Sequence, residues 1–201
     1  MENPPAGSHL ARCYAVVDMG TQSHTFQGDT RLQRDVRLSF ELPTELMTGK
    51  YDPKAKGRPH SVHVTAKMSL HPKARLRKLL KGWRGKDFTP EEAETFDPKK
   101  LVGLAARLSL VEDGDFVNID AVSPVDPKKE KLPKQINPPI FVSLEEGEFE
   151  PEMFERLSPK SKEKIQGSPE YKKLVSEHGE GEPASEPEAG DGGGQSDDTP
   201  F

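Results

Sequence analysis

The sequence is poor in cysteine and in long apolar runs. Its 201 residues include one cysteine, Cys13, which excludes an internal disulfide framework and a zinc site with the usual ligand spacing. No run approaches the ~20 apolar residues that span a bilayer, and the first residues lack the basic-then-apolar pattern of a secretion signal. We therefore expect a cytoplasmic protein that makes no membrane contact.

Catalytic motifs are also lacking. The Gly-Trp-Arg-Gly-Lys stretch at 82–86 is too short for a phosphate-binding loop, and no Ser/His/Asp arrangement or metal-binding carboxylate cluster stands out. His60 and His63 are three residues apart near a strand, where their side chains face opposite sides, so they predict no metal site. The sequence indicates a protein that is not an enzyme and holds no cofactor.

Apolar residues are scarce, at 32% of the chain against 31% charged residues, and aromatic residues make up 6%. This composition predicts a modest core joined to unfolded parts. The net charge of −5 hides a strong asymmetry. The region 50–86 carries twelve Lys or Arg and one acid, Asp52, whereas 177–201 carries eight carboxylates and no Lys or Arg. Such asymmetry is typical of a nucleic-acid-binding domain with a disordered acidic tail.

Apolar periodicity predicts a mainly β domain. Residues alternate with period two in several runs, and between the third and fourth of these the period becomes helical around Leu76, Leu80 and Trp83. The order of strand, strand, strand, helix, strand, strand is that of the OB-fold, a five-stranded Greek-key barrel; an SH3-like barrel or an open α+β sheet also fits. The predicted strands cover 10–17, 36–42, 61–70, 104–111 and 116–122, with 18–30 as a loop and 140–144 as a short strand packed on the barrel.

We divide the chain into four parts. Residues 1–8 are expected to be a flexible arm, and 9–124 an OB-like nucleic-acid-binding domain. A Pro- and Lys-rich extension with short helices covers 125–176, with little core of its own. The disordered acidic tail covers 177–201.

The last residues carry a recognisable pattern. An apolar ring beside a free carboxylate, led in by two aspartates, is a ligand for an apolar pocket with a basic rim. Asp197, Asp198, Pro200 and Phe201 resemble the C-terminal tip of bacterial single-stranded-DNA-binding proteins, which reads Asp-Asp-Asp-Ile-Pro-Phe. Ser196 and Thr199 depart from that pattern. The resemblance implies a tail that recruits replication, repair or recombination proteins.

The central region is similar to a group of phage and prophage proteins. The similarity is carried by 76–88, which ends in Gly-Trp-Arg-Gly-Lys-Asp-Phe, and continues through Glu91-Glu92 and Leu101-Val102-Gly103. It implies a phage replication or recombination setting, and hence the host cytoplasm, but offers no catalytic motif to transfer.

Binding of single strands without sequence preference needs cations along the phosphate path and aromatic faces for the bases. Phe26 and Tyr51 are the stacking candidates because each lies in a predicted polar or basic loop. Trp83 is assigned to the core, together with Phe40, Phe88, Phe96 and Phe116. The candidate cations are Arg31, Arg34, Arg37, Lys50, Lys54, Lys56, Arg58 and Lys67. The competing interpretation is that these charges only solvate the surface.

These observations predict a protein that binds single-stranded DNA without strong sequence preference during phage or bacterial replication and recombination. Its tip is expected to recruit partner proteins. The alternative is a non-catalytic phage adaptor whose barrel binds protein instead of DNA. The sequence leaves the oligomeric state open.

Overall fold

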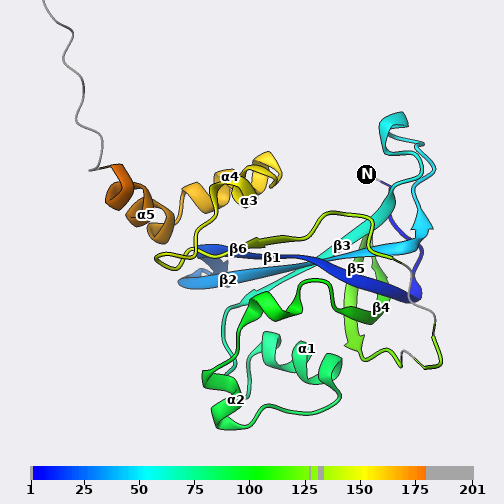
Figure 1. Ribbon diagram of the computed structural model, residues 1–201, viewed down its shortest axis with the longest axis horizontal. Helices are drawn as coiled ribbons and strands as arrows, with labels where there is room; N and C mark the ends of the chain where they lie inside the picture. The colour runs from blue at the N-terminus through cyan, green and yellow to red at the C-terminus, as the bar shows by residue number, and fades with distance from the viewer. Residues whose placement is uncertain (1, 127, 131–133, 180–201) are drawn as a thin grey trace, which may run out of the picture.

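The computed structural model describes residues 2–126, 128–130 and 134–179. It is a mainly β protein with a six-stranded sheet and few helices (Figure 1). The predicted tail after Gly179, with Asp197, Asp198, Pro200 and Phe201, lies outside the described residues. The strands are β1 (Gly7–Phe26), β2 (Asp29–Leu46), β3 (Pro59–Lys67), β4 (Ala105–Asp113), β5 (Phe116–Ser123) and β6 (Ile140–Val142). The helices are α1 (Arg75–Arg84), α2 (Pro90–Glu94), α3 (Pro151–Glu155), α4 (Pro159–Gln166) and α5 (Pro169–Gly179), with 3-10 turns at Pro53–Ala55 and Pro98–Leu101.

The sheet is open. Its strands follow the order β3-β2-β1-β4-β5 with antiparallel pairing throughout, and β6 runs parallel to β1. The first part of β1 pairs with β4 from Gly7 to Arg12, and the next part pairs with β6 from Ala15 to Val17. The two outer strands, β3 and β5, approach each other without a hydrogen-bonded pairing in the described part of the chain. The mainly β prediction is therefore confirmed at the level of the sheet.

The first two strands are much longer than the sequence predicts. Residues 18–30, expected as a loop, form the end of β1 and a tight turn at Gln27 and Gly28, whose φ angles of 51° and 88° suit a two-residue hairpin turn. This ribbon was missed because its residues beyond Gln22 are exposed on both faces and show no apolar alternation. A bulge between Asp18 and Gly20 marks where the ribbon leaves the sheet.

The main core lies between the inner face of the sheet and α1. Trp83 is buried, as predicted; its ring centroid lies 5.3 Å from that of Phe40, and its indole nitrogen donates to the Ala105 carbonyl at 2.7 Å. Phe88 is also buried and packs edge-on against Phe96. The prediction for Phe116 is wrong: the ring is 70% exposed, because it opens β5 opposite Asp113 at the end of a hairpin.

A second apolar cluster lies on the opposite face of β1. Val17 and Met19 pack there against β6 and against Phe154, Ile165 and Leu174 of the C-terminal helices. Figure 1 shows α3 and α4 across the sheet from α1 and α2. The extension therefore gains a core by sharing β1. Helix α4 lies between the short helices that the sequence predicts at 151–157 and 169–177. It begins after Ser158, whose hydroxyl accepts from the Ser161 amide at 3.3 Å.

The segment before β6 is hydrogen-bonded to the outer face of the sheet. Glu41 of β2 is fully buried, and its carboxylate accepts from the amides of Ile136 and Asn137 at 2.7 and 2.6 Å. Two such donors satisfy the buried charge. No helix in the described residues is long and apolar enough to span a membrane.

Candidate nucleic-acid interface

Arg37 is the central cation of the outer face of β2 and β3. Its neighbours Val36 and Leu38 point into the core, so the alternation of the strand turns Arg37 to the other side. The half-buried guanidinium donates to Ser161 Oγ at 2.8 Å and to Thr65 Oγ1 at 3.4 Å. Burial lowers its pKa, but an arginine remains charged at neutral pH.

No carboxylate in the described part of the chain forms an ion pair with Arg37; its hydrogen-bond partners are hydroxyl groups. A half-buried cation normally has an anionic partner, because the desolvated charge is costly. The charge of Arg37 is therefore not neutralised by a carboxylate in the described residues, which favours contact with an anionic ligand.

Two further basic groups lie beside Arg37. The pKa of His63, on β3, is lowered first by partial desolvation and then by the positive charges of Arg37 and Lys164. His63 therefore lies close to the positive charges of Arg37 on β2 and Lys164 on α4. Lys67, at the end of β3, is exposed and shares the strand face of His63 and Thr65. A phosphate group is the kind of anion that several cations and hydroxyl groups bind together.

Lys164 also borders a groove of about 660 Å³ between α4 and the β1–β2 ribbon. Lys160 and the 72%-exposed Leu32 line the same groove. The helix is held in place because Gln22 Nε2 donates to the Lys164 carbonyl at 3.1 Å. The groove is thus continuous with the cations around Arg37 through Lys164.

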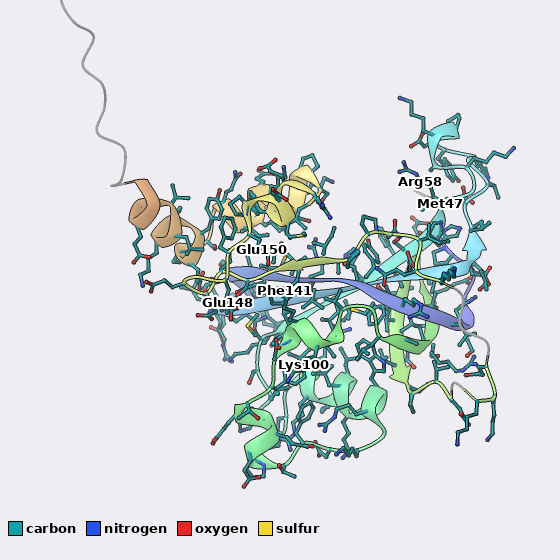
Figure 2. All side chains as sticks on the ribbon, in the orientation of Figure 1. Met47, Arg58, Lys100, Phe141, Glu148 and Glu150 are labelled. Atoms are coloured by element: carbon teal, nitrogen blue, oxygen red, sulfur yellow. The ribbon has the colours of Figure 1, made fainter. Side chains whose placement is uncertain are left out.

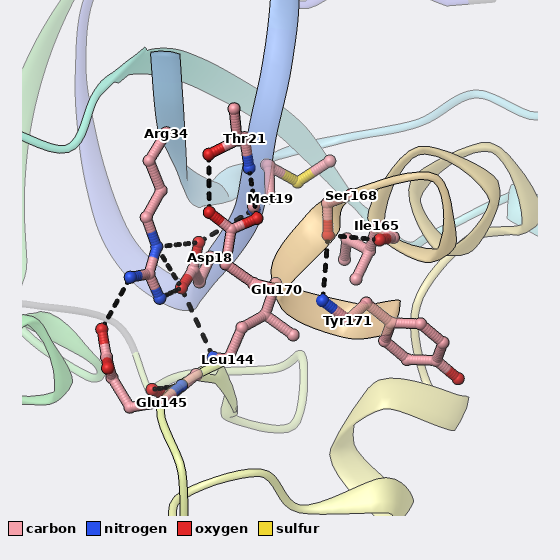
Figure 3. Close-up of polar contacts among 12 residues, drawn as sticks. Asp18, Met19, Thr21, Arg34, Leu144, Glu145, Ile165, Ser168, Glu170 and Tyr171 are labelled. Atoms are coloured by element: carbon pink, nitrogen blue, oxygen red, sulfur yellow. Dashed lines mark hydrogen bonds and ion pairs between the residues drawn. The ribbon is translucent and has the colours of Figure 1, made fainter. Parts of the chain in front are cut away.

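The turn between α4 and α5 is anchored to the same ribbon. Glu170 accepts from the amide and hydroxyl of Thr21 at 2.8 and 2.6 Å (Figure 3). Gly20 has a positive φ, and a Cβ there would lie 2.4 Å from the Ser168 side chain. This close approach requires glycine.

The end of the ribbon carries Phe26 and Arg31. Phe26 is 74% exposed, and Arg31 is also exposed on the neighbouring strand. Asp29 lies directly opposite Phe26, and Arg31 lies opposite His24, two residues along the ribbon. The ring offers a face for stacking a base, and the cation offers a contact for a phosphate.

Arg34 is engaged elsewhere. Its Nε donates to Asp18 at 3.0 Å, its Nη2 pairs with the same carboxylate, and its Nη1 lies 2.7 Å from Glu145 (Figure 3). Desolvation alone lowers the pKa of Arg34, but the hydrogen bonds and charge of Asp18 raise it above the usual value. Arg34 therefore stabilises the contact between the ribbon and the segment after β6, and we leave it out of the interface.

The basic loop between β2 and β3 forms a separate surface. Tyr51 is 64% exposed, with Lys50 Nζ 5.3 Å from its ring centroid. Lys54, Lys56 and Arg58 are exposed in the same loop; Figure 2 labels Arg58. The 18 residues of β2 separate this loop from Phe26, a span of up to roughly 55 Å at about 3.3 Å per residue. Figure 1 shows the two at opposite ends of the sheet, so the structure does not bring Phe26 and Tyr51 together.

Much of the basic helix α1 is neutralised internally. Arg77 and Lys81 pair with Asp87, at 2.8 and 3.3 Å. Arg84 and Lys86 pair with Glu92, at 2.8 and 3.1 Å. The high positive charge of 50–86 therefore does not form one continuous surface.

Sequence reasoning missed the contribution of the extension. Ser161 and Lys164 of α4 reach Arg37 and His63 across more than a hundred residues of chain, and Lys160 and Leu32 line the groove. The Ser158-Pro159 start of α4 was a usable signal. Its docking site on β1 had no local signal.

The described residues contain no group of three or more His, Cys, Asp or Glu side chains that could hold a metal ion. No protein-family model, curated protein or solved structure matches the chain.

Proposed function

We propose that this protein binds single-stranded DNA without strong sequence preference, on the outer face of β2 and β3 and in the groove beside α4. The observation that carries the proposal is Arg37, a half-buried cation with hydroxyl partners and no carboxylate partner among the described residues. His63 and Lys164 share its surroundings. A single strand bound along this face and groove would place phosphates at Arg37 and Lys164 and a base on Phe26.

The topology supports the same surface. We propose that the sheet is an OB barrel opened between β3 and β5, because α1 lies between β3 and β4 and the strand order β3-β2-β1-β4-β5 fits that connectivity. In OB-folds the face of the second and third strands, with the loop after the first strand, commonly binds oligonucleotides. Phe26 is the last residue of β1, directly before that loop.

The setting and the partners are part of the proposal. The resemblance of the last six residues supports recruitment of replication or recombination proteins through Asp197, Asp198, Pro200 and Phe201. The similarity of 76–88 supports a phage or prophage origin. The basic loop with Tyr51 would serve as a second, separate contact for a longer strand.

The test is fluorescence anisotropy with labelled oligo-dT and a duplex of equal length, at low and moderate salt. We expect tighter binding of the single strand, with affinity falling by a log–log slope of about 0.7 per phosphate neutralised. Arg37→Gln should weaken binding by about tenfold or more, because it removes a charge-assisted contact. Lys100→Gln is the matched control at an exposed lysine outside the interface.

Lys164→Gln is a second variant, and it leaves the residues of the sheet unchanged. The slope of log affinity against log salt concentration should fall by about 0.7 in this variant. Absence of oligo-dT binding by the intact chain at low salt would overturn the proposal and favour the adaptor alternative. Unchanged affinity and slope in both variants would place the DNA elsewhere.

A further inference from the structure

An apolar cavity lies on the opposite side of the sheet from the Arg37 surface. It is a cavity of about 450 Å³ between the inner face of β1 and β2, the helices α1 and α2, and the segment after β6. Val36, Leu38 and Leu76 of the core form its floor, and the half-buried Met68, Phe96 and Phe141 form its walls. This size and lining are those of a pocket that holds a ligand.

The charged residues that line the cavity are acidic, namely Asp18, Asp97, Glu145 and Glu148. Two cations lie next to them: Arg34 pairs with Asp18 and Glu145, and Lys99 Nζ lies 5.3 Å from the ring centroid of Phe141. Glu148 is exposed, and its carboxylate has no ion-pair partner in the described part of the chain. Figure 2 labels Phe141 and Glu148. The cavity therefore combines an apolar interior with a negative rim.

This combination discriminates between occupants. Nucleic acid is repelled by the rim, and so is the chain's own acidic end with Phe201, whose aspartates match the sign of the rim. A peptide segment with an apolar side chain between lysines or arginines fits both the interior and the rim.

We infer that this cavity is a docking site for an apolar, cation-flanked segment of a partner protein, separate from the DNA surface. A branched or aromatic side chain enters between Phe96, Phe141 and Met68, while a flanking cation meets Glu148. The chain would thus bind a partner on one side of the sheet and single-stranded DNA on the other. The inference does not depend on DNA binding.

The experiment follows the methionine methyl signals of the full chain by NMR while peptides are added. The probe peptide is Lys-Lys-Leu-Phe-Lys-Lys, and the matched control is Glu-Glu-Leu-Phe-Glu-Glu. Met68 lines the cavity, whereas Met47 lies at the start of the distant basic loop. We expect the basic peptide to shift the Met68 methyl and to leave Met47 unchanged. The acidic peptide should shift neither.

Two rim variants test the charge. Glu148→Lys should lower the affinity for the basic peptide by about fivefold to tenfold, because one attraction becomes a repulsion. Glu146→Lys, an exposed position in the same segment outside the cavity, should change it by less than about twofold. Neither variant should alter oligo-dT binding. No Met68 shift with the basic peptide, equal shifts with both peptides, or equal effects of the two variants would overturn the inference.

Discussion

The two hairpins of the sheet end in exposed phenylalanines set in different electrostatic surroundings. Phe26, at the end of β1, is 74% exposed and lies opposite Asp29, with Arg31 two residues further along β2. The neighbouring groove carries Lys160 and Lys164 beside Glu163. At the end of β4 and β5, Phe116 is 70% exposed among Glu112, Asp113 and Asp115. A ring of either kind offers a face for stacking, but only the first has arginine and lysine side chains close to it in sequence or in the adjoining groove. Exposure of an aromatic ring is thus insufficient to identify a DNA contact; the neighbouring charges decide it.

The largest expected difference between the hairpins comes from removing each ring. Phe26→Ala should weaken oligo-dT binding by about 1–3 kcal/mol, the usual contribution of a base–aromatic stack, or roughly fivefold or more. Phe116→Ala is the matched control and should leave affinity unchanged. Anisotropy titration at fixed salt measures both. Equal losses would show that the charge contrast does not select the binding end.

Charge reversal at the acidic hairpin sharpens the comparison. Asp113→Lys combined with Asp115→Lys would surround Phe116 with cations in place of carboxylates. We expect a gain of about twofold to fivefold in oligo-dT affinity at low salt that disappears at high salt, because exposed charges are screened. A gain that persists at high salt would contradict an electrostatic origin.

The smallest expected effect is a pH dependence at the Arg37 surface. Since the pKa of His63 lies below its usual value of 6.5, the unfolded chain binds more protons in that range, and the free energy of unfolding falls as pH drops below about 6.5. A bound phosphate favours the protonated ring, so DNA affinity should rise over the same window. His63→Gln should flatten both changes, as followed by denaturant unfolding and anisotropy. The β4–β5 hairpin contains no histidine, so it should contribute nothing to this pH dependence. If His63→Gln kept the pH dependence of the wild-type protein, His63 would be excluded as its cause.

The sequence predicts the elements whose pattern is local. The alternation in β2 and β3 and the helical spacing of Leu80 and Trp83 both appear in the structure. The exposed ribbon at the end of β1 has no apolar pattern, so it could not be distinguished from a loop.

The candidate site was predictable only in part. The types of residue required, cations and rings, are visible in the sequence, but their partners are not. Arg34 and Arg37 are three residues apart and both basic, yet one is held by Asp18 and Glu145 and the other contacts hydroxyl groups. That difference depends on Glu145 after β6 and Ser161 of α4, which lie more than a hundred residues further along the chain.

The most direct test of the account is an amide NMR footprint of oligo-dT on the full chain. The account predicts shifts at Thr65 on β3, at Lys164 on α4 and at Phe26, with no shift at Phe116. Shifts confined to α1 or to the β4–β5 hairpin would contradict it, because the strand would then lie where carboxylates dominate or already neutralise the cations.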